Sequence, residues 1–123
     1  MNIGGNIQAL LQVKSEGAKN AIGEVTIQWV DCMSIRGWLD LSTGDSKHTT
    51  FYAKIQESTH IFLCNFTNLT GVISRQGEQE SVDVTSDNAR MVIDGLVYEI
   101  LLIDNPMGMN EHLEIYLRFI GGQ

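Results

Sequence analysis

The chain has 123 residues, of which 43% are hydrophobic, and its formal net charge at neutral pH is −7. Nucleic-acid binders gather lysine and arginine to displace counterions from phosphates, so eight scattered basic residues argue against that class. No apolar run reaches the ~18 residues of a membrane-spanning helix, and the chain does not open with a signal-peptide pattern. We therefore expect one domain over residues 1–123, without a membrane partner, that stays in the cytoplasm where it is made.

The first 66 residues carry alternating apolar positions that are typical of β-strands. Residues 1–6 have no pattern and are expected to form a flexible tail. The segment 7–14 fits either a helix or a strand, and we favour a strand from about Leu10. A small, polar loop is expected over 15–23. Three strands should follow within this part of the chain: Glu24–Val30, Met33–Leu41 and His60–Phe66.

Two tryptophans lie in these strands. Trp29 shares the apolar face of its strand with Ile27, so we expect it in the core. Trp38 lies on the mixed face of the next strand, where Arg36 is its neighbour two residues away. Tryptophan beside arginine is typical of contact surfaces, so Arg36 and Trp38 form a candidate interface. Gly37 between them predicts a bulge or a sharp bend.

The middle of the chain is the most polar part. A turn is expected over 42–47 and a short helix over His48–Gln56. Residues 67–87 contain few aliphatic side chains, and a long polar connection in a small β domain is usually functional or disordered. We predict a long flexible loop there. Six of its side chains are candidates for lining a channel or contacting a neighbouring subunit: Arg75, Gln76, Glu78, Glu80, Asp83 and Asp87.

The last third predicts a β-meander over 88–120. Its three β-type runs are Arg90–Ile93, Leu96–Ile103 and His112–Ile120. Asp94-Gly95 separates the first two, and this dipeptide between apolar runs indicates a tight hairpin because a type I′ turn needs positive φ at both central positions. Taken together, the elements predict an all-β, mainly antiparallel protein. We expect a small β-barrel or sandwich with a long flexible loop and at most one short helix.

The residues that usually carry catalysis do not form a recognisable set. The three histidines lack metal-ligand spacing, and His60 and Cys64 would stand too far apart on one strand to chelate an ion. There is no glycine-rich phosphate loop and no nucleophile elbow. Cys32 and Cys64 fit buried free thiols. We therefore expect no enzyme, no cofactor, no metal and no small-molecule substrate.

The order of short motifs along the chain resembles one known family, the head–tail joining or head-closure (stopper) proteins of tailed bacteriophages and prophages. The resemblance runs from about Leu10 to Ile120 and is strongest at Asn88–Ile100. The other matching segments are Gly23-Glu24, Trp29-Val30-Asp31, Gly37-Trp38-Leu39, Thr43-Gly44, Phe51-Tyr52-Ala53-Lys54, Ser58-Thr59-His60, Ile103-Asp104-Asn105-Pro106 and His112-Leu113-Glu114-Ile115. The chain departs from the family at Leu63-Cys64-Asn65, where many relatives have an arginine, and its 67–87 segment is longer.

This resemblance implies a structural virion protein that forms a ring between the portal or adaptor and the tail. Such rings make passive contact with DNA in the channel and in many systems close it. The implied partners are copies of the same chain, which can be monomeric in isolation, together with portal, adaptor and tail proteins. The implied location is the host cytoplasm during assembly and then the virion connector.

Two alternatives stay open. One is a tail-completion protein of the same connector. The other is a ligand- or peptide-binding β-barrel with no role in virions, which would show a concave apolar pocket with a few convergent polar groups.

Overall fold

The computed structural model describes residues 4–19, 21–41, 58–75 and 77–122. Within these ranges every regular element is a strand except for one short 3-10 turn, so the predicted all-β class is confirmed. The elements are β1 Ile7–Lys19, β2 Val25–Leu41, β3 His60–Asn65, β4 Thr70–Arg75, β5 Glu78–Asp83, β6 Ala89–Ile93, β7 Leu96–Asp104, η1 Pro106–Gly108 and β8 His112–Gly122. The short helix predicted over His48–Gln56 lies outside the described residues. No helix in the described ranges is long and apolar enough to cross a membrane.

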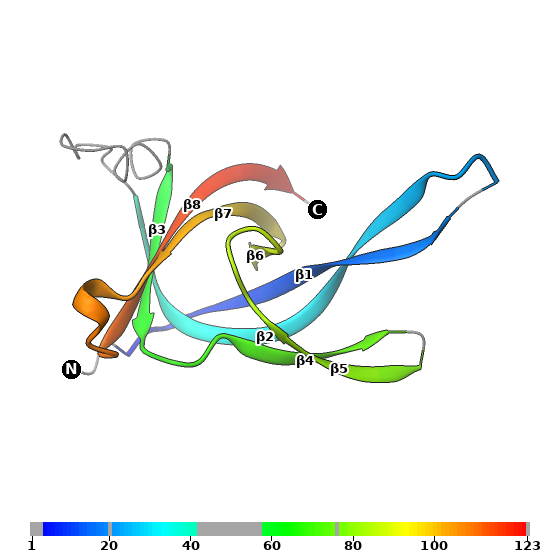
Figure 1. Cartoon of the computed structure of the whole chain (residues 1–123). Coiled ribbons are helices and arrows are strands. Elements are labelled where there is room, and N and C mark those ends of the chain that lie inside the picture. The colour runs from blue at the N-terminus through cyan, green and yellow to red at the C-terminus, as the bar shows by residue number, and fades with distance from the viewer. Residues whose placement is uncertain (1–3, 20, 42–57, 76, 123) are drawn as a thin grey trace.

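Six strands close into a barrel in the order β1-β2-β3-β8-β7-β6, and β6 pairs with β1 to complete the ring. Every strand pairing in the barrel is antiparallel. Of the two architectures that the sequence allowed, the protein adopts the barrel (Figure 1). The strands β6, β7 and β8 are consecutive in the chain and adjacent in the sheet, as in a meander. The remaining pair, β4 and β5, forms a separate two-stranded sheet.

The turn between β6 and β7 is the tight hairpin that the sequence indicated. Ile93 pairs with Leu96, so Asp94 and Gly95 alone form the turn. Both have positive φ, 51° and 77°. This is the geometry of a type I′ turn, which the dipeptide Asp-Gly favours.

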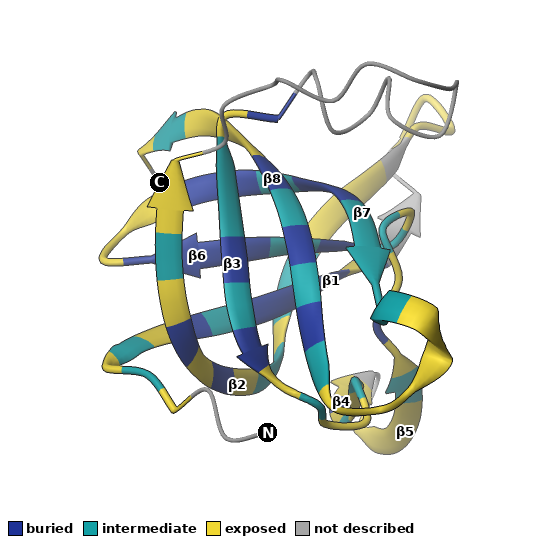
Figure 2. Cartoon of the chain, turned by 90° about the vertical axis from the view of Figure 1, so that its left-hand side faces the viewer, coloured by how far each residue is buried: buried dark blue, intermediate teal, exposed yellow. Residues whose placement is uncertain are grey.

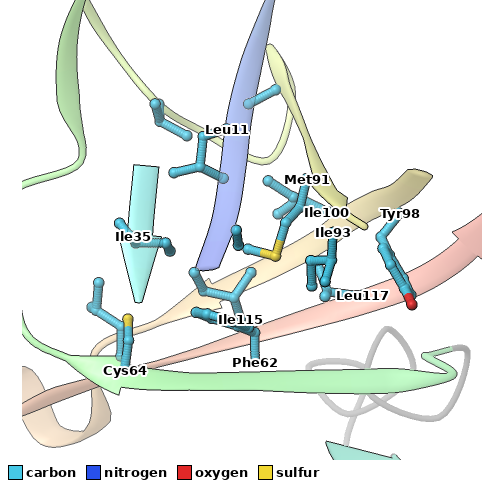
Figure 3. Close-up of a cluster of buried hydrophobic side chains, with 14 of the residues drawn as sticks. Leu11, Ile35, Phe62, Cys64, Met91, Ile93, Tyr98, Ile100, Ile115 and Leu117 are labelled. Atoms are coloured by element: carbon cyan, nitrogen blue, oxygen red, sulfur yellow. The ribbon is translucent and has the colours of Figure 1, made fainter. Parts of the chain in front are cut away.

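The barrel is filled by side chains that point inward from all six of its strands (Figure 3). Buried and more exposed residues alternate along β3 and along the first part of β8 (Figure 2). Six of the core side chains have no measurable exposure: Ala9, Leu11, Phe62, Met91, Ile115 and Leu117. Removing this much apolar surface from water is the main source of stability in a domain of this size.

Gly37 serves the core in a way that the sequence did not indicate. Pairing of β2 with β1 ends at Gly37 and pairing with β3 begins there, without a register shift at this residue, so the predicted bulge is not there. A Cβ at this position would instead overlap the carbonyl oxygen of Leu63 and lie 2.8 Å from Cε1 of Phe62. Glycine is therefore required because a neighbouring strand and a core ring approach the backbone closely.

The first two strands are longer than predicted. The expected loop over 15–23 is wrong, because β1 continues to Lys19, and the two strands expected over 24–41 are one strand, β2. β6 covers only Leu10–Val13 of β1, so the distal residues of β1 pair with β2 alone among the described strands. These distal parts, residues 15–19 and 25–28, form a two-stranded ribbon that leaves the barrel, here called the β1–β2 arm (Figure 1).

The long polar loop predicted over 67–87 is also wrong, since most of it is the β4–β5 hairpin. Its few aliphatic residues are enough to anchor the hairpin to the barrel. Ile73 is 2% exposed and Val84, just after β5, is 6% exposed, and both belong to the barrel core cluster. Glu80 stands directly opposite Ile73 and therefore shares its face of the hairpin, yet it is exposed, and Gly77 in the turn has φ 81°. The β4–β5 hairpin projects from the same side of the barrel as the β1–β2 arm (Figure 1).

A break in the β1–β2 register explains the position of Trp29. Leu11 pairs with Met33 and Gln12 pairs with Asp31, so Cys32 is an extra residue on β2. Side chains alternate between the inner and outer faces along a strand. One extra residue therefore moves each preceding side chain of β2 to the opposite face. Val30 therefore packs against the core, whereas Ile27 is 57% exposed. The prediction that Trp29 lies in the core is wrong, and Trp29 is half-buried on the outer face.

Candidate interaction surface

A hydrogen-bonded row of side chains crosses the outer face of the barrel. Gln12 on β1 is only 7% exposed although it points outward. Its Nε2 donates a hydrogen bond to Oδ1 of Asp31 at 2.9 Å, and its Oε1 accepts one from Nε of Arg90 at 2.8 Å. The registers of β2, β1 and β6 place these three residues side by side. The row therefore fixes the guanidinium of Arg90 on the barrel surface.

Arg90 and Lys14 both lie against the ring of Trp29. The central guanidinium carbon of Arg90 is 4.5 Å from the ring centroid, and Nζ of Lys14 is 5.8 Å from it. Both distances are within the ~6 Å over which a cation is attracted to an aromatic face. Burial lowers the pKa of Arg90 from its ordinary value, but an arginine in a protein stays charged. Trp29 therefore holds two positive charges on one part of the surface.

This cationic corner opens into a groove of about 810 Å³. The lining side chains come from both ends of the chain: Lys14, Trp29, Ser86, Asp87, Ala89, Arg90, Val97, Glu99, Ile120 and Gly122. Glu99 forms an ion pair with Arg118 on β8. The groove thus has a mixed lining, half apolar and half polar or charged, and a size within the usual range for ligand sites. We call it the Trp29 groove.

Asn88 determines the shape of one wall of the Trp29 groove. Its side-chain oxygen accepts a hydrogen bond from the Thr85 N–H at 2.8 Å, and its amide donates to the Asp83 carbonyl at 2.8 Å. The N–H of Lys14 donates to the Asn88 carbonyl, again at 2.8 Å. These bonds tie the β5–β6 connection to β1 and place Asp87 at the groove.

Of the six side chains predicted in the 67–87 segment, the four that the structure describes do not form one site. Gln76 lies outside the described residues, and Arg75 is the last residue of β4. Glu78, Glu80 and Asp83 are exposed on β5, where Asp83 accepts a hydrogen bond from Oγ1 of Thr70 at 2.8 Å. Asp87 lines the Trp29 groove instead. The acidic residues predicted for a loop are therefore exposed, but three of them lie on the strand β5.

Arg36 and Trp38 lie on the outer face of β2, as their alternation predicted. Trp38 is 44% exposed and stands opposite Leu63 on β3, while Arg36 stands opposite Gln8 on β1. Arg36 also lines a smaller cavity of about 250 Å³. Their exposure is compatible with the predicted interface, which stays a prediction.

The described residues do not assemble a recognisable catalytic or metal site. No group of three or more metal-binding side chains is found among them. Cys32 and Cys64 are free thiols, and burial raises the pKa of Cys64 to about 11, so it is not a thiolate at neutral pH. On β8, Glu114 accepts hydrogen bonds from Nε2 of His112 at 3.0 Å and from the hydroxyl of Tyr116 at 2.8 Å. None of these three residues lines either cavity described above.

The groove residues Lys14, Trp29 and Arg90 were not predicted as a site. Their meeting depends on the extra residue at Cys32, which turns Trp29 outward. The sequence does hold one signal for it. Val30, Cys32 and Met33 are apolar within four positions, which interrupts strict alternation and marks a place where the facing can change.

Comparison with known proteins adds no relative: no family model and no curated protein matches this chain.

Proposed function

We propose that the protein is a structural subunit of the head–tail connector of a tailed bacteriophage or prophage. Copies of it form a ring between the portal or adaptor and the tail, and the ring can close the DNA channel. Two lines support this proposal. The first is the ordered set of motifs from Leu10 to Ile120 that resembles the head-closure proteins. The second is the shape of the molecule.

The projecting ribbons are the observation that carries the proposal. A closed barrel has no unpaired edge, so it offers little backbone to a neighbour. Here the β1–β2 arm and the β4–β5 hairpin extend from one side of that barrel (Figure 1). An isolated two-stranded ribbon is marginally stable in water, whereas packing against another surface stabilises it. The arms therefore suit a protein that works by contacting neighbouring subunits.

The charge of the β4–β5 hairpin suits a position near DNA. Glu78, Glu80 and Asp83 are exposed, and β5 has no basic residue. Carboxylates repel phosphates across a channel, so DNA can slide past such a strand without adhering. In the ring, the hairpin faces either the axial channel or the adjacent subunit.

Location in the particle tests the proposal. Cryo-electron microscopy of virions from the phage or prophage that encodes this chain should show its density as a ring at the portal exit. Deleting the gene should give filled heads that lose DNA or fail to join tails. Density at the tail end of the connector would favour the tail-completion protein. Normal, infectious particles without the chain would contradict the proposal.

One observation favours a second function, a peptide-binding β-barrel outside virions. The Trp29 groove has the size of such a site, and its lining combines apolar side chains, among them Trp29, with polar groups that could bind a peptide backbone. A chain with that function would be absent from purified particles. Quantitative mass spectrometry of virions, compared with the host cytoplasm, separates the two functions.

A further inference from the structure

The connection between β7 and β8 presents two methionine side chains to solvent. Met107 is 91% exposed and Met109 is 58% exposed. Met107 also has φ 56°, in the left-handed region that glycine adopts far more readily than a residue with a long side chain. Position 107 therefore departs from local preference twice, in its exposure and in its backbone. Such departures are expected at functional sites, since neither contributes to the stability of the fold.

Hydrogen bonds fix the backbone of this segment, residues 105–110, which we call the Met107 loop. Nδ2 of Asn105 donates a hydrogen bond to Oδ1 of Asn110 at 2.7 Å, and Oδ1 of Asn105 accepts one from the Asn110 N–H at 3.1 Å. The Gly108 N–H donates to the Asn105 carbonyl at 2.8 Å. A loop that is already ordered loses little entropy when it binds, so its methionines are suited to contact a partner.

The Trp29 groove has the lining that a methionine side chain can use. Trp29 is half-buried, and Ile120, which also lines the groove, is 62% exposed. Methionine sulfur makes favourable contacts with the edges of aromatic rings, and its unbranched side chain adapts to irregular apolar surfaces. The exposed apolar groups of the loop and of the groove can therefore cover one another.

The charges beside the two sites are complementary. Glu111 directly follows the Met107 loop and is exposed. Lys14 and Arg90 lie on the Trp29 ring at the groove. Of the two carboxylates that line the groove, Glu99 is already in an ion pair and Asp87 is the other. The groove thus carries a positive balance within a chain of net charge −7, and this balance favours an acidic neighbour.

The two sites lie at opposite ends of β8. The Met107 loop comes just before this strand, whereas Gly122, its last residue, lines the groove. With a rise of about 3.3 Å per residue, the 11 residues of β8 separate the two sites by roughly 30 Å along the strand (Figure 1). The loop of one copy is therefore too far from its own groove, and contact between the two sites joins two copies.

We infer that the Trp29 groove binds the Met107 loop of a second copy of this chain. Met107 enters the groove and lies against Trp29, while Glu111 faces Lys14. The inference rests on the proposed function, because this contact is the joint between neighbouring subunits of the ring. Loop and groove are different surfaces, so each copy keeps one of them free after pairing. Such head-to-tail contacts continue until the rotation closes a ring.

Replacing Met107 separates the joint from the fold. Glycine adopts φ 56° without strain, so the midpoint of thermal unfolding should not fall in Met107→Gly. Self-association, measured by sedimentation velocity up to about 1 mM, should nevertheless weaken at least ~10-fold, and Ile120→Asn in the groove should weaken it equally. Val72→Asn removes another apolar side chain, 56% exposed on β4, and should change it less than ~2-fold.

Mixing the two variants shows whether the joint is head-to-tail. The Met107→Gly protein keeps an intact groove and the Ile120→Asn protein keeps an intact loop, so an equimolar mixture should form one-to-one pairs and nothing larger. The chain has two tryptophans, whose indole N–H signals are separate in a heteronuclear NMR spectrum. When isotope-labelled Met107→Gly protein is mixed with unlabelled Ile120→Asn protein, the Trp29 signal should shift and the Trp38 signal should not. Unlabelled Met107→Gly protein should shift neither.

Four results would overturn the inference. These are no self-association of the unchanged protein at about 1 mM, equal weakening by Val72→Asn, association that survives Met107→Gly, or a shift of the Trp38 signal alone. The proposed function fails separately, if the chain is absent from virions. A chain that self-associates through the Met107 loop without occurring in virions would retain the joint and lose the connector role.

Discussion

The guanidinium of Arg90 lies over the ring of Trp29, with 4.5 Å between its central carbon and the ring centroid. The two residues belong to β6 and β2, which do not pair with each other. Gln12 on the intervening strand β1 accepts a hydrogen bond from Arg90 and donates one to Asp31 on β2, and so it links β6 to β2. The cationic corner of the groove thus depends on one nearly buried amide.

Replacing that amide should weaken both the barrel and the groove. In Gln12→Ala, Arg90 and Asp31 each lose a hydrogen-bond partner, and we expect the free energy of unfolding to fall by about 1–2 kcal/mol. Urea unfolding followed by tryptophan fluorescence measures it. Gln8→Ala is the matched control, since Gln8 is exposed on the same strand, and it should change the value by less than ~0.5 kcal/mol. Equal effects would contradict a structural role for the row.

Glycine at position 37 should be much less replaceable than glycine at position 77. Gly37→Ala places a methyl group against the Leu63 carbonyl and the Phe62 ring, so β2 and β3 must separate. We expect a loss of about 3 kcal/mol or more. Gly77→Ala has open space and costs only the strain of φ 81°, about 1–2 kcal/mol. Thermal unfolding of both variants checks the order, and a smaller effect at Gly37 would refute the close-approach explanation.

Alternation of apolar residues was enough to predict an all-β protein and the outward facing of Trp38, and the Asp-Gly dipeptide was enough to predict the hairpin at Asp94-Gly95. It failed at Trp29 because an extra residue at Cys32 inverts the facing, and such a bulge depends on pairing with β1. It also failed for the β4–β5 hairpin. That hairpin is anchored by Ile73 and Val84, which contact a core built by distant strands. The Trp29 groove combines residues from five strands, so local pattern alone could not indicate it.

The anchoring of the β4–β5 hairpin gives a prediction with an internal control. Ile73 is 2% exposed and Val72, next to it on β4, is 56% exposed. Ile73→Ala should cost about 2–4 kcal/mol because it leaves a cavity under the hairpin, whereas Val72→Ala should cost less than ~0.5 kcal/mol. Hydrogen exchange should show faster exchange of the β4 and β5 amides in Ile73→Ala. Unchanged exchange would mean that the hairpin is held by other contacts.

Cys64 should make the barrel less stable in alkali. Burial raises the pKa of its thiol from 9.0 to about 11 in the folded protein. Above pH 9 the unfolded chain loses this proton while the folded chain keeps it, so the free energy of unfolding falls as pH rises toward 11. The loss from this group is roughly 2 kcal/mol near pH 10.5. Urea unfolding between pH 8 and about 10.5 measures it.

Cys64→Ala is the control for this pH dependence. The variant should be less stable at pH 8 because it removes a buried sulfur, yet it should lose less stability than the unchanged protein as the pH rises. Tyr98, whose pKa is also raised by burial and by the nearby charge of Asp94, is present in both proteins and contributes equally to each. The difference between the two pH profiles therefore belongs to the thiol. Parallel profiles would show that Cys64 ionises in the folded barrel as readily as in the unfolded chain.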